Sequence, residues 1–196
     1  MQNVPKLNFT YSYIYDSTFA ALAGKKYSEK AKDEAAAYIK VLEKDFSHFS
    51  KSVLSDIRKA SGLEWQKQII DVYISKYAPY SISVPLTIRI TKGAKVGTAI
   101  LVHELAHNIV FQNQKRIRYD KLFGDFSKES METKYHIIED AILYLLNKRM
   151  FSDGTGGFFR YDDWVYPKAG KDYRRAMNIV LKQRAENIIK KYISRC

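Results

Sequence analysis

The segment from Val96 to Val110 constrains the fold most, because apolar residues fall on every side of its helical wheel. A helix that is apolar all round is a buried helix. This one nevertheless carries His103, Glu104 and His107. Positions i and i+4 of a helix lie on one face, about 40° apart, so the two histidines point the same way. Buried imidazoles need a polar partner or a metal.

The sequence His103-Glu104-Leu105-Ala106-His107 fits the HExxH pattern, which points to a metal as that partner. Two imidazoles at this spacing can bind one Zn²⁺, which takes nitrogen ligands at about 2.0–2.1 Å. Glu104 lies about 100° around the helix, from where its carboxylate can take a proton from a zinc-bound water. The alternative is a pair of hydrogen-bonded core histidines that hold no metal.

A catalytic zinc needs a third protein ligand, and the motif helix does not supply it. Val110 stands where the extended metzincin pattern has a glycine, and Asn113 stands where it has its third histidine. The third ligand must therefore come from further along the chain.

The helix predicted at Met131–Met150 offers candidates for the third ligand. Glu139 lies on its apolar face, where a carboxylate is costly unless a cation meets it. Glu139 is therefore our first choice and His136 our second, with Asp140 and Glu132 as the remaining choices. Asp140 can instead orient a ligand histidine, or be a solvated residue or a local partner of His136.

Together these residues resemble the gluzincin zinc peptidases, in which two helices present two histidines and a glutamate to one zinc. The resemblance covers about Ser81 to Met150 and rests on His103, Glu104, His107 and Glu139. The size is that of the compact members, the minigluzincins. Small cytoplasmic peptidases that cut repressors are another relative.

The resemblance implies a zinc-dependent endopeptidase with one Zn²⁺ per chain and a peptide or protein as substrate. Glu104 would act as general base on the metal-bound water and then deliver the proton to the leaving amine. Tyr161 and Tyr166, in the loop after the second helix, are the candidates for stabilising the oxyanion. Ile138 and Leu143 stand where the family has an asparagine and an aspartate around its glutamate ligand.

The rest of the chain predicts a mainly helical α+β fold. Three segments show regular periods: a strand or extended arm at Leu7–Tyr15, one or two helices at Ser28–Ala60 with Ser28 as N-cap, and a helix at Leu63–Tyr77. Ser81–Ile90 alternates with a period of two, and Pro85 within it suits an edge strand. We therefore expect a small zincin-like domain with a short sheet, whose edge strand precedes the motif helix, and flanking helices.

The 196 residues suit a single domain, with 81–150 as metal-site core, 1–80 as a strand and helical part, and 151–196 as a loop and basic helix. No apolar run approaches the roughly 18 residues of a transmembrane segment. The first residues lack the order of a secretory signal, and the lone Cys196 excludes an internal disulfide. We expect a cytoplasmic protein; a secreted protein whose signal peptide has been removed is the alternative.

The net charge of +12 is concentrated toward the C-terminus, where a helix is predicted at Lys171–Ser194. Its apolar side should dock on the domain and leave a basic face of five residues in solvent: Arg174, Arg175, Lys182, Lys190 and Lys191. The simplest interpretation is a solvated Lys-rich helix, and we expect at most weak, salt-sensitive binding of a polyanion. The alternative function is a nucleic-acid-associated protein with a structural zinc and a phosphate-binding helix.

Overall fold

The structure is a computed structural model that describes residues 4–48, 50–152 and 170–194. Two compact units make up the chain: Met1–Leu54 with Trp65–Asn108, and Ser55–Glu64 with Ile109–Cys196. Within the described residues, eight α-helices and one four-stranded mixed sheet confirm the predicted mainly helical α+β class. Over the same residues, no helix is both long and apolar enough to cross a membrane.

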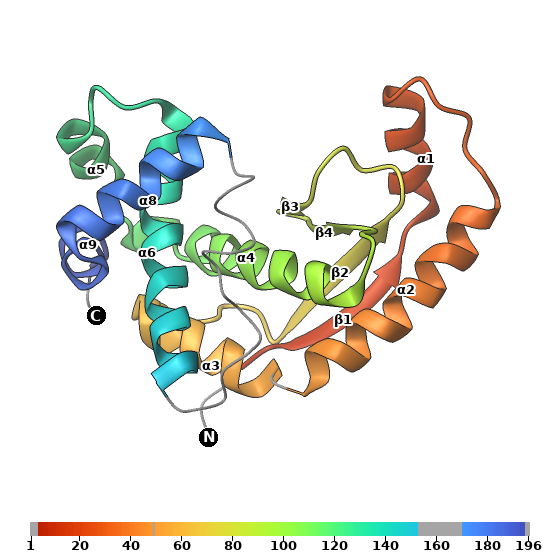
Figure 1. Cartoon of the computed structure of the whole chain (residues 1–196), viewed down its shortest axis with the longest axis horizontal. Helices are drawn as coiled ribbons and strands as arrows, with labels where there is room; N and C mark the ends of the chain where they lie inside the picture. Colours follow the sequence, from red (N-terminus) through yellow and green to blue (C-terminus); the bar gives the residue numbers. More distant parts are fainter. Residues whose placement is uncertain (1–3, 49, 153–169, 195–196) are drawn as a thin grey trace. The chain divides into compact units, whose positions relative to one another are not determined.

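The first unit is built on the sheet, whose strand order is β1-β2-β4-β3. Strands β1 (Lys6–Tyr11), β2 (Ile69–Ser75) and β4 (Leu86–Arg89) are parallel, and β3 (Ile82–Ser83) pairs antiparallel with β4. Helix α2 (Lys30–Ser47) packs along β1 and β2 (Figure 1). Its buried positions recur every three or four residues, the period of one helix face: Ala31, Ala35, Tyr38, Leu42 and Phe46.

The strand predicted at Leu7–Tyr15 is shorter than expected, because a helix begins inside it. Ser12 is the N-cap of α1 (Tyr13–Leu22), and its hydroxyl accepts from the Tyr15 amide. One turn later, the buried Asp16 carboxylate accepts from the Ser75 hydroxyl at 2.6 Å and from the next two backbone amides at 2.9 and 3.0 Å. These bonds fasten α1 to the end of β2.

Two other predicted helical segments differ from the structure in extent or type. The helix predicted at Leu63–Tyr77 is wrong, because strand β2 occupies the second half of that segment. The residues at 69, 70, 72 and 74 are β-branched, and such residues favour a strand when parallel partner strands lie on both sides. Ser28–Ala60 does form two helices, α2 and α3 (Ser50–Ser61). The N-cap residue of α2 is Glu29 rather than Ser28, and it makes no side-chain capping bond.

The single strand predicted at Ser81–Ile90 is a hairpin. Val84 and Pro85 form the turn between β3 and β4, so the missing N–H of Pro85 leaves no gap in the ladder. Since β4 is flanked by β2 and β3, only the two-residue β3 lies at this edge of the sheet. An edge strand does precede the motif helix, as predicted, but it is much shorter than the alternating segment.

The second unit packs its C-terminal helices on α6 (Met131–Ser152). The helix predicted at Lys171–Ser194 is instead two helices, α8 (Lys171–Gln183) and α9 (Ala185–Tyr192). Arg184 breaks it with a φ of 69°, a conformation uncommon outside glycine. The predicted apolar side is buried at Met177, Val180, Ile188 and Tyr192, whereas Leu181 is 54% exposed. The short α5 (Tyr119–Asp125) contacts α9, and the Tyr192 hydroxyl donates to Asp125 at 2.8 Å.

Candidate metal centre

Helix α4 (Ala94–Gln112) carries the HExxH motif, and its first turns pack closely on α2. A Cβ atom at Gly97 would collide with the Tyr38 hydroxyl, so a larger residue here would have to displace the Tyr38 side chain. One residue later, the Thr98 hydroxyl donates to the Asp45 carboxylate at 2.7 Å. These two contacts set the position of α4, and therefore of its histidines, relative to the sheet-bound α2.

The predicted burial of α4 is confirmed on the sides away from the histidines. The fully buried apolar residues of the motif region are Leu101, Val102, Leu105, Ala106, Ile109 and Val110. His103 and His107 are only half-buried. Both imidazoles therefore keep some access to solvent, which a ligand-exchanging metal site requires.

His103 and His107 have the spacing of a metal-binding pair. Their Nε2 atoms are 3.1 Å apart, and their rings are 4.8 Å apart between centroids. Two nitrogens bound to one tetrahedral zinc at about 2.05 Å would lie about 3.3 Å from each other. The observed separation is thus close to that of two zinc-bound nitrogens, and it also suits a hydrogen bond between the two imidazoles, the metal-free alternative.

Glu104 lies beside this pair in a confined position. Its side chain is 8% exposed, and one carboxylate oxygen accepts from the Ser83 hydroxyl at 2.6 Å. Burial raises the pKa of Glu104 to about 7, and the hydrogen bond from Ser83 opposes that shift. A carboxyl group that titrates near neutrality can both accept and return a proton at physiological pH.

The hairpin that supplies Ser83 is held by a second residue of the same helix face. Asn108 lies four positions after Glu104, and its side-chain amide donates to the Ser83 carbonyl at 2.7 Å. Sequence reasoning identified neither residue. The i, i+4 spacing of Glu104 and Asn108 was visible in the motif helix, but Ser83 is 21 residues away and is found only through the fold.

On α6, the three central candidates for a third ligand are buried: Glu139 and His136 are each 5% exposed, and Asp140 is 1% exposed. The interpretation of Asp140 as a solvated residue is therefore wrong. Burial raises the pKa of Glu139 to about 7, with a smaller contribution from Glu132, while a backbone hydrogen bond and His136 lower it.

His136 has a defined orientation within α6. Its Nδ1 lies 2.8 Å from the backbone carbonyl oxygen of Glu132. A carbonyl oxygen can only accept, so Nδ1 carries a proton, and in the neutral imidazole Nε2 is the nitrogen that would bind a metal. The Tyr173 ring packs on the imidazole at 4.0 Å between centroids. This is the tautomer and support that a metal-ligating histidine requires.

Among the described residues, His103, His107 and His136 form a group that can hold a metal ion. This group supports a metal site. Its third member, His136, was our second choice for the third ligand. Glu139 as a ligand stays a prediction. Tyr161 and Tyr166, predicted to stabilise the oxyanion, lie outside the described residues.

The predicted basic face is partly neutralised. Arg175 forms two hydrogen bonds with the Glu129 carboxylate, at 2.5 and 3.0 Å, and Lys191 pairs with Asp125 at 2.9 Å. Two of its five cations thus already have acidic partners.

Comparison with protein-family models, with curated proteins and with solved structures finds no match to this chain. The resemblance to gluzincins accordingly rests on the motif residues alone.

Proposed function

We propose that this chain is a zinc-dependent endopeptidase. The observation that carries the proposal is the pair of Nε2 atoms of His103 and His107, 3.1 Å apart on one helix, beside the buried carboxyl group of Glu104. A structural zinc site can use two such histidines but has no use for a carboxylate of near-neutral pKa next to them.

His103 and His107 would hold the metal, and α6 would supply the third ligand. Glu139 is the ligand expected from the sequence, and His136 is the one favoured by the three-histidine group and by the orientation of its Nδ1 toward the Glu132 carbonyl. Zinc held there supplies Lewis acidity and lowers the pKa of a water molecule toward neutrality.

Glu104 would move the proton during hydrolysis. Its carboxylate accepts a proton from the attacking water and passes it to the amine nitrogen as the peptide C–N bond breaks. The hydrogen bond from Ser83 occupies one carboxylate oxygen and fixes the plane of the group. The second oxygen is then presented in a constant direction, which limits the entropy that proton transfer costs.

The substrate would be an extended peptide segment. A peptide can add to a sheet edge by backbone hydrogen bonds, and β3 lies at the sheet edge next to the motif helix. With only two residues, β3 can fix the direction of a substrate but little of its sequence. We therefore expect unstructured segments to be cleaved much faster than compactly folded proteins.

Zinc content and peptide hydrolysis together test the proposal. Protein reconstituted with zinc at neutral pH should hold about one zinc per chain and cleave an unstructured peptide library. His103→Ala and His107→Ala should lose both properties. His48→Ala is the matched control, because His48 is exposed and lies on the boundary of α2, outside the motif. Zinc absent from the reconstituted protein, or retained in full by both motif variants, would refute the metal site; zinc without hydrolysis of any peptide would refute the peptidase.

A further inference from the structure

Helix α1 of the first unit exposes apolar side chains on the side opposite to its buried residues. Its only charged residue, Asp16, is buried together with Ala20, whereas Ile14 and Leu22 are 71% and 78% exposed. Ile14, Thr18 and Leu22 follow one another at i, i+4 and i+8, so they form one line along the helix, and all three are exposed. A helix of a globular protein normally turns its polar side to water, so α1 has the reverse of the usual arrangement.

Contacts on the opposite side of α1 enforce this exposure. The Asp16 carboxylate accepts three hydrogen bonds from residues 75–77, and the Tyr15 ring packs edge-to-face on Tyr73 with 4.9 Å between the centroids. A rotation of α1 that buried Ile14 would break these bonds and leave a carboxylate without its partners, which is costly. The apolar line is therefore a fixed feature of the first unit.

An amphipathic ring and two lysines border the apolar line. Tyr13, at the start of α1, is 58% exposed. Lys25 and Lys26 come shortly after the end of the helix, and both are exposed. Between residues 13 and 28 no acidic side chain is exposed, and the first one after them, Glu29, precedes Lys30. The border of the apolar line is therefore positively charged.

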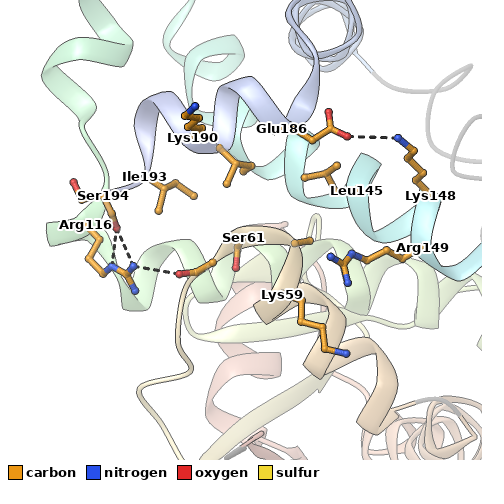
Figure 2. A pocket seen from close by; sticks show the side chains of 13 residues that line it. Lys59, Ser61, Arg116, Leu145, Lys148, Arg149, Glu186, Lys190, Ile193 and Ser194 are labelled. Carbon is orange, nitrogen blue, oxygen red and sulfur yellow. Dashed lines mark hydrogen bonds and ion pairs between the residues drawn. The ribbon is translucent and has the colours of Figure 1, made fainter. Parts of the chain in front are cut away.

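These two lysines differ from several cations of the second unit, which already have partners. Around a cavity of about 550 Å³ in that unit, Arg116 donates to two backbone carbonyls and Lys148 pairs with Glu186 (Figure 2). In the described part of the chain, neither Lys25 nor Lys26 forms an ion pair. The positive charge next to α1 is therefore available to an external anion.

We propose that α1 binds the surface of an anionic lipid membrane, with Ile14 and Leu22 among the lipid headgroups. Apolar side chains gain free energy when they leave water for this region, and the ring of Tyr13 suits its boundary because the hydroxyl stays hydrated. Lys25 and Lys26 would lie against acidic headgroups, which attract cations close to the surface. Ile14 and Leu22 are about 12 Å apart along the helix axis, so both reach a flat surface at once.

Vesicle binding by the full chain tests this proposal. Co-sedimentation should show binding to vesicles of equal parts phosphatidylcholine and phosphatidylglycerol, and at least about tenfold weaker binding to phosphatidylcholine alone. The double variant Ile14→Ser, Leu22→Ser should bind at least about tenfold more weakly than the wild type, although its net charge is the same. Val41→Ser is the matched control, because it removes a 50% exposed aliphatic side chain from α2 of the same unit.

Charge-matched variants separate this surface from the general basicity of the chain. A net charge of +12 attracts the protein to any anionic vesicle. Lys25→Gln, Lys26→Gln should weaken binding at least about fivefold. Lys40→Gln, Lys44→Gln removes two exposed cations from α2 and should weaken binding about twofold or less.

A tryptophan reporter locates the contact. The emission of Leu22→Trp should move to shorter wavelength when the anionic vesicles are added, and that of Val41→Trp should stay constant, because only position 22 enters the membrane. The proposal fails if neither vesicle is bound, if both are bound equally, if the serine double variant binds like Val41→Ser, if the two lysine pairs are equivalent, or if Leu22→Trp does not respond. A wild-type dimer in sedimentation velocity that Ile14→Ser, Leu22→Ser dissociates, without vesicle binding, would overturn it in favour of a second copy of the chain.

Discussion

Helices α4 and α6 both bury ionisable side chains, but these side chains are positioned by different means. On α4, the helical repeat alone brings His103 and His107 together, with their Nε2 atoms 3.1 Å apart. On α6, His136, Glu139 and Asp140 are all buried. His136 and Asp140 share one face by the same i, i+4 spacing, and Glu139 lies about 60° from His136 on the other side. The helical repeat is therefore enough to define the histidine pair on α4, whereas the choice among the α6 residues depends on packing.

The buried carboxyl groups of Glu104 on α4 and Glu139 on α6 also differ in what surrounds them. Burial raises the pKa of both Glu104 and Glu139 to about 7. At Glu104, the hydrogen bond from Ser83 opposes the rise in pKa, and Ser83 lies in a hairpin 21 residues earlier in the chain. At Glu139 the opposing contributions come from its own helix, through a backbone hydrogen bond and His136. The α4 carboxyl is thus held in a fixed orientation by the fold, as a general base should be.

Replacing Glu104 is expected to have the largest effect. Glu104→Gln keeps the shape but removes the base, so hydrolysis of an unstructured peptide should fall by about 10² or more while zinc content is unchanged. Zinc analysis and steady-state kinetics on the same samples make the measurement. Glu43→Gln, at an exposed position on α2, is the control. Retention of more than a tenth of the activity would remove Glu104 from the mechanism and end the distinction between the two helices.

The stability of the metal-free protein should depend on pH through Glu139. The folded protein keeps a proton on this carboxyl up to pH about 7, whereas the unfolded chain loses it near 4.5, so the free energy of unfolding should fall between those values and then level off. Glu139→Gln mimics the protonated form and should stabilise the protein by up to about 3 kcal/mol at pH 8, with no gain at pH 4. Urea denaturation at both pH values measures this. If the wild type and Glu139→Gln are equally stable at pH 8, the Glu139 carboxyl is not shielded from water.

Parallel zinc titrations should identify the third ligand. Glu139→Ala and His136→Ala should differ, and the variant that loses the ligand should bind zinc at least about tenfold more weakly. Weaker binding in His136→Ala alone assigns the three-histidine site, and weaker binding in Glu139→Ala alone assigns the gluzincin-like site. Unchanged affinity in both variants would show that α6 supplies no ligand.

Reversing charges on the C-terminal helices should have the smallest effect. The triple variant Arg174→Glu, Lys182→Glu and Lys190→Glu should lose any weak, salt-sensitive DNA or RNA binding, because that binding depends on phosphate contacts. Its turnover of a small peptide should stay within about twofold of the wild type. Collapse of turnover with folding and zinc content intact would place these helices in the active site.

Sequence reasoning worked best where the signal was local. The helices of α4 and α6, the HExxH spacing and the burial of Glu139 all follow from the 3.6-residue period and from apolar neighbours. It failed where a segment's partner is distant. The residues of β2 were assigned to a helix, because an apolar run of that length fits either structure until β1 and β4 lie beside it.

The spacing of His103, Glu104 and His107 is enough to predict that one buried helix presents two histidines and a glutamate, because the geometry of a helix depends only on spacing. Only the fold shows that Ser83 contacts Glu104 and that the alternating segment turns into a hairpin. It also decided that acidic partners neutralise Arg175 and Lys191. The Ser83–Glu104 contact and the two ion pairs join residues that are far apart in the chain, and the hairpin takes its place in the sheet through the distant β2, so no local period encodes these features.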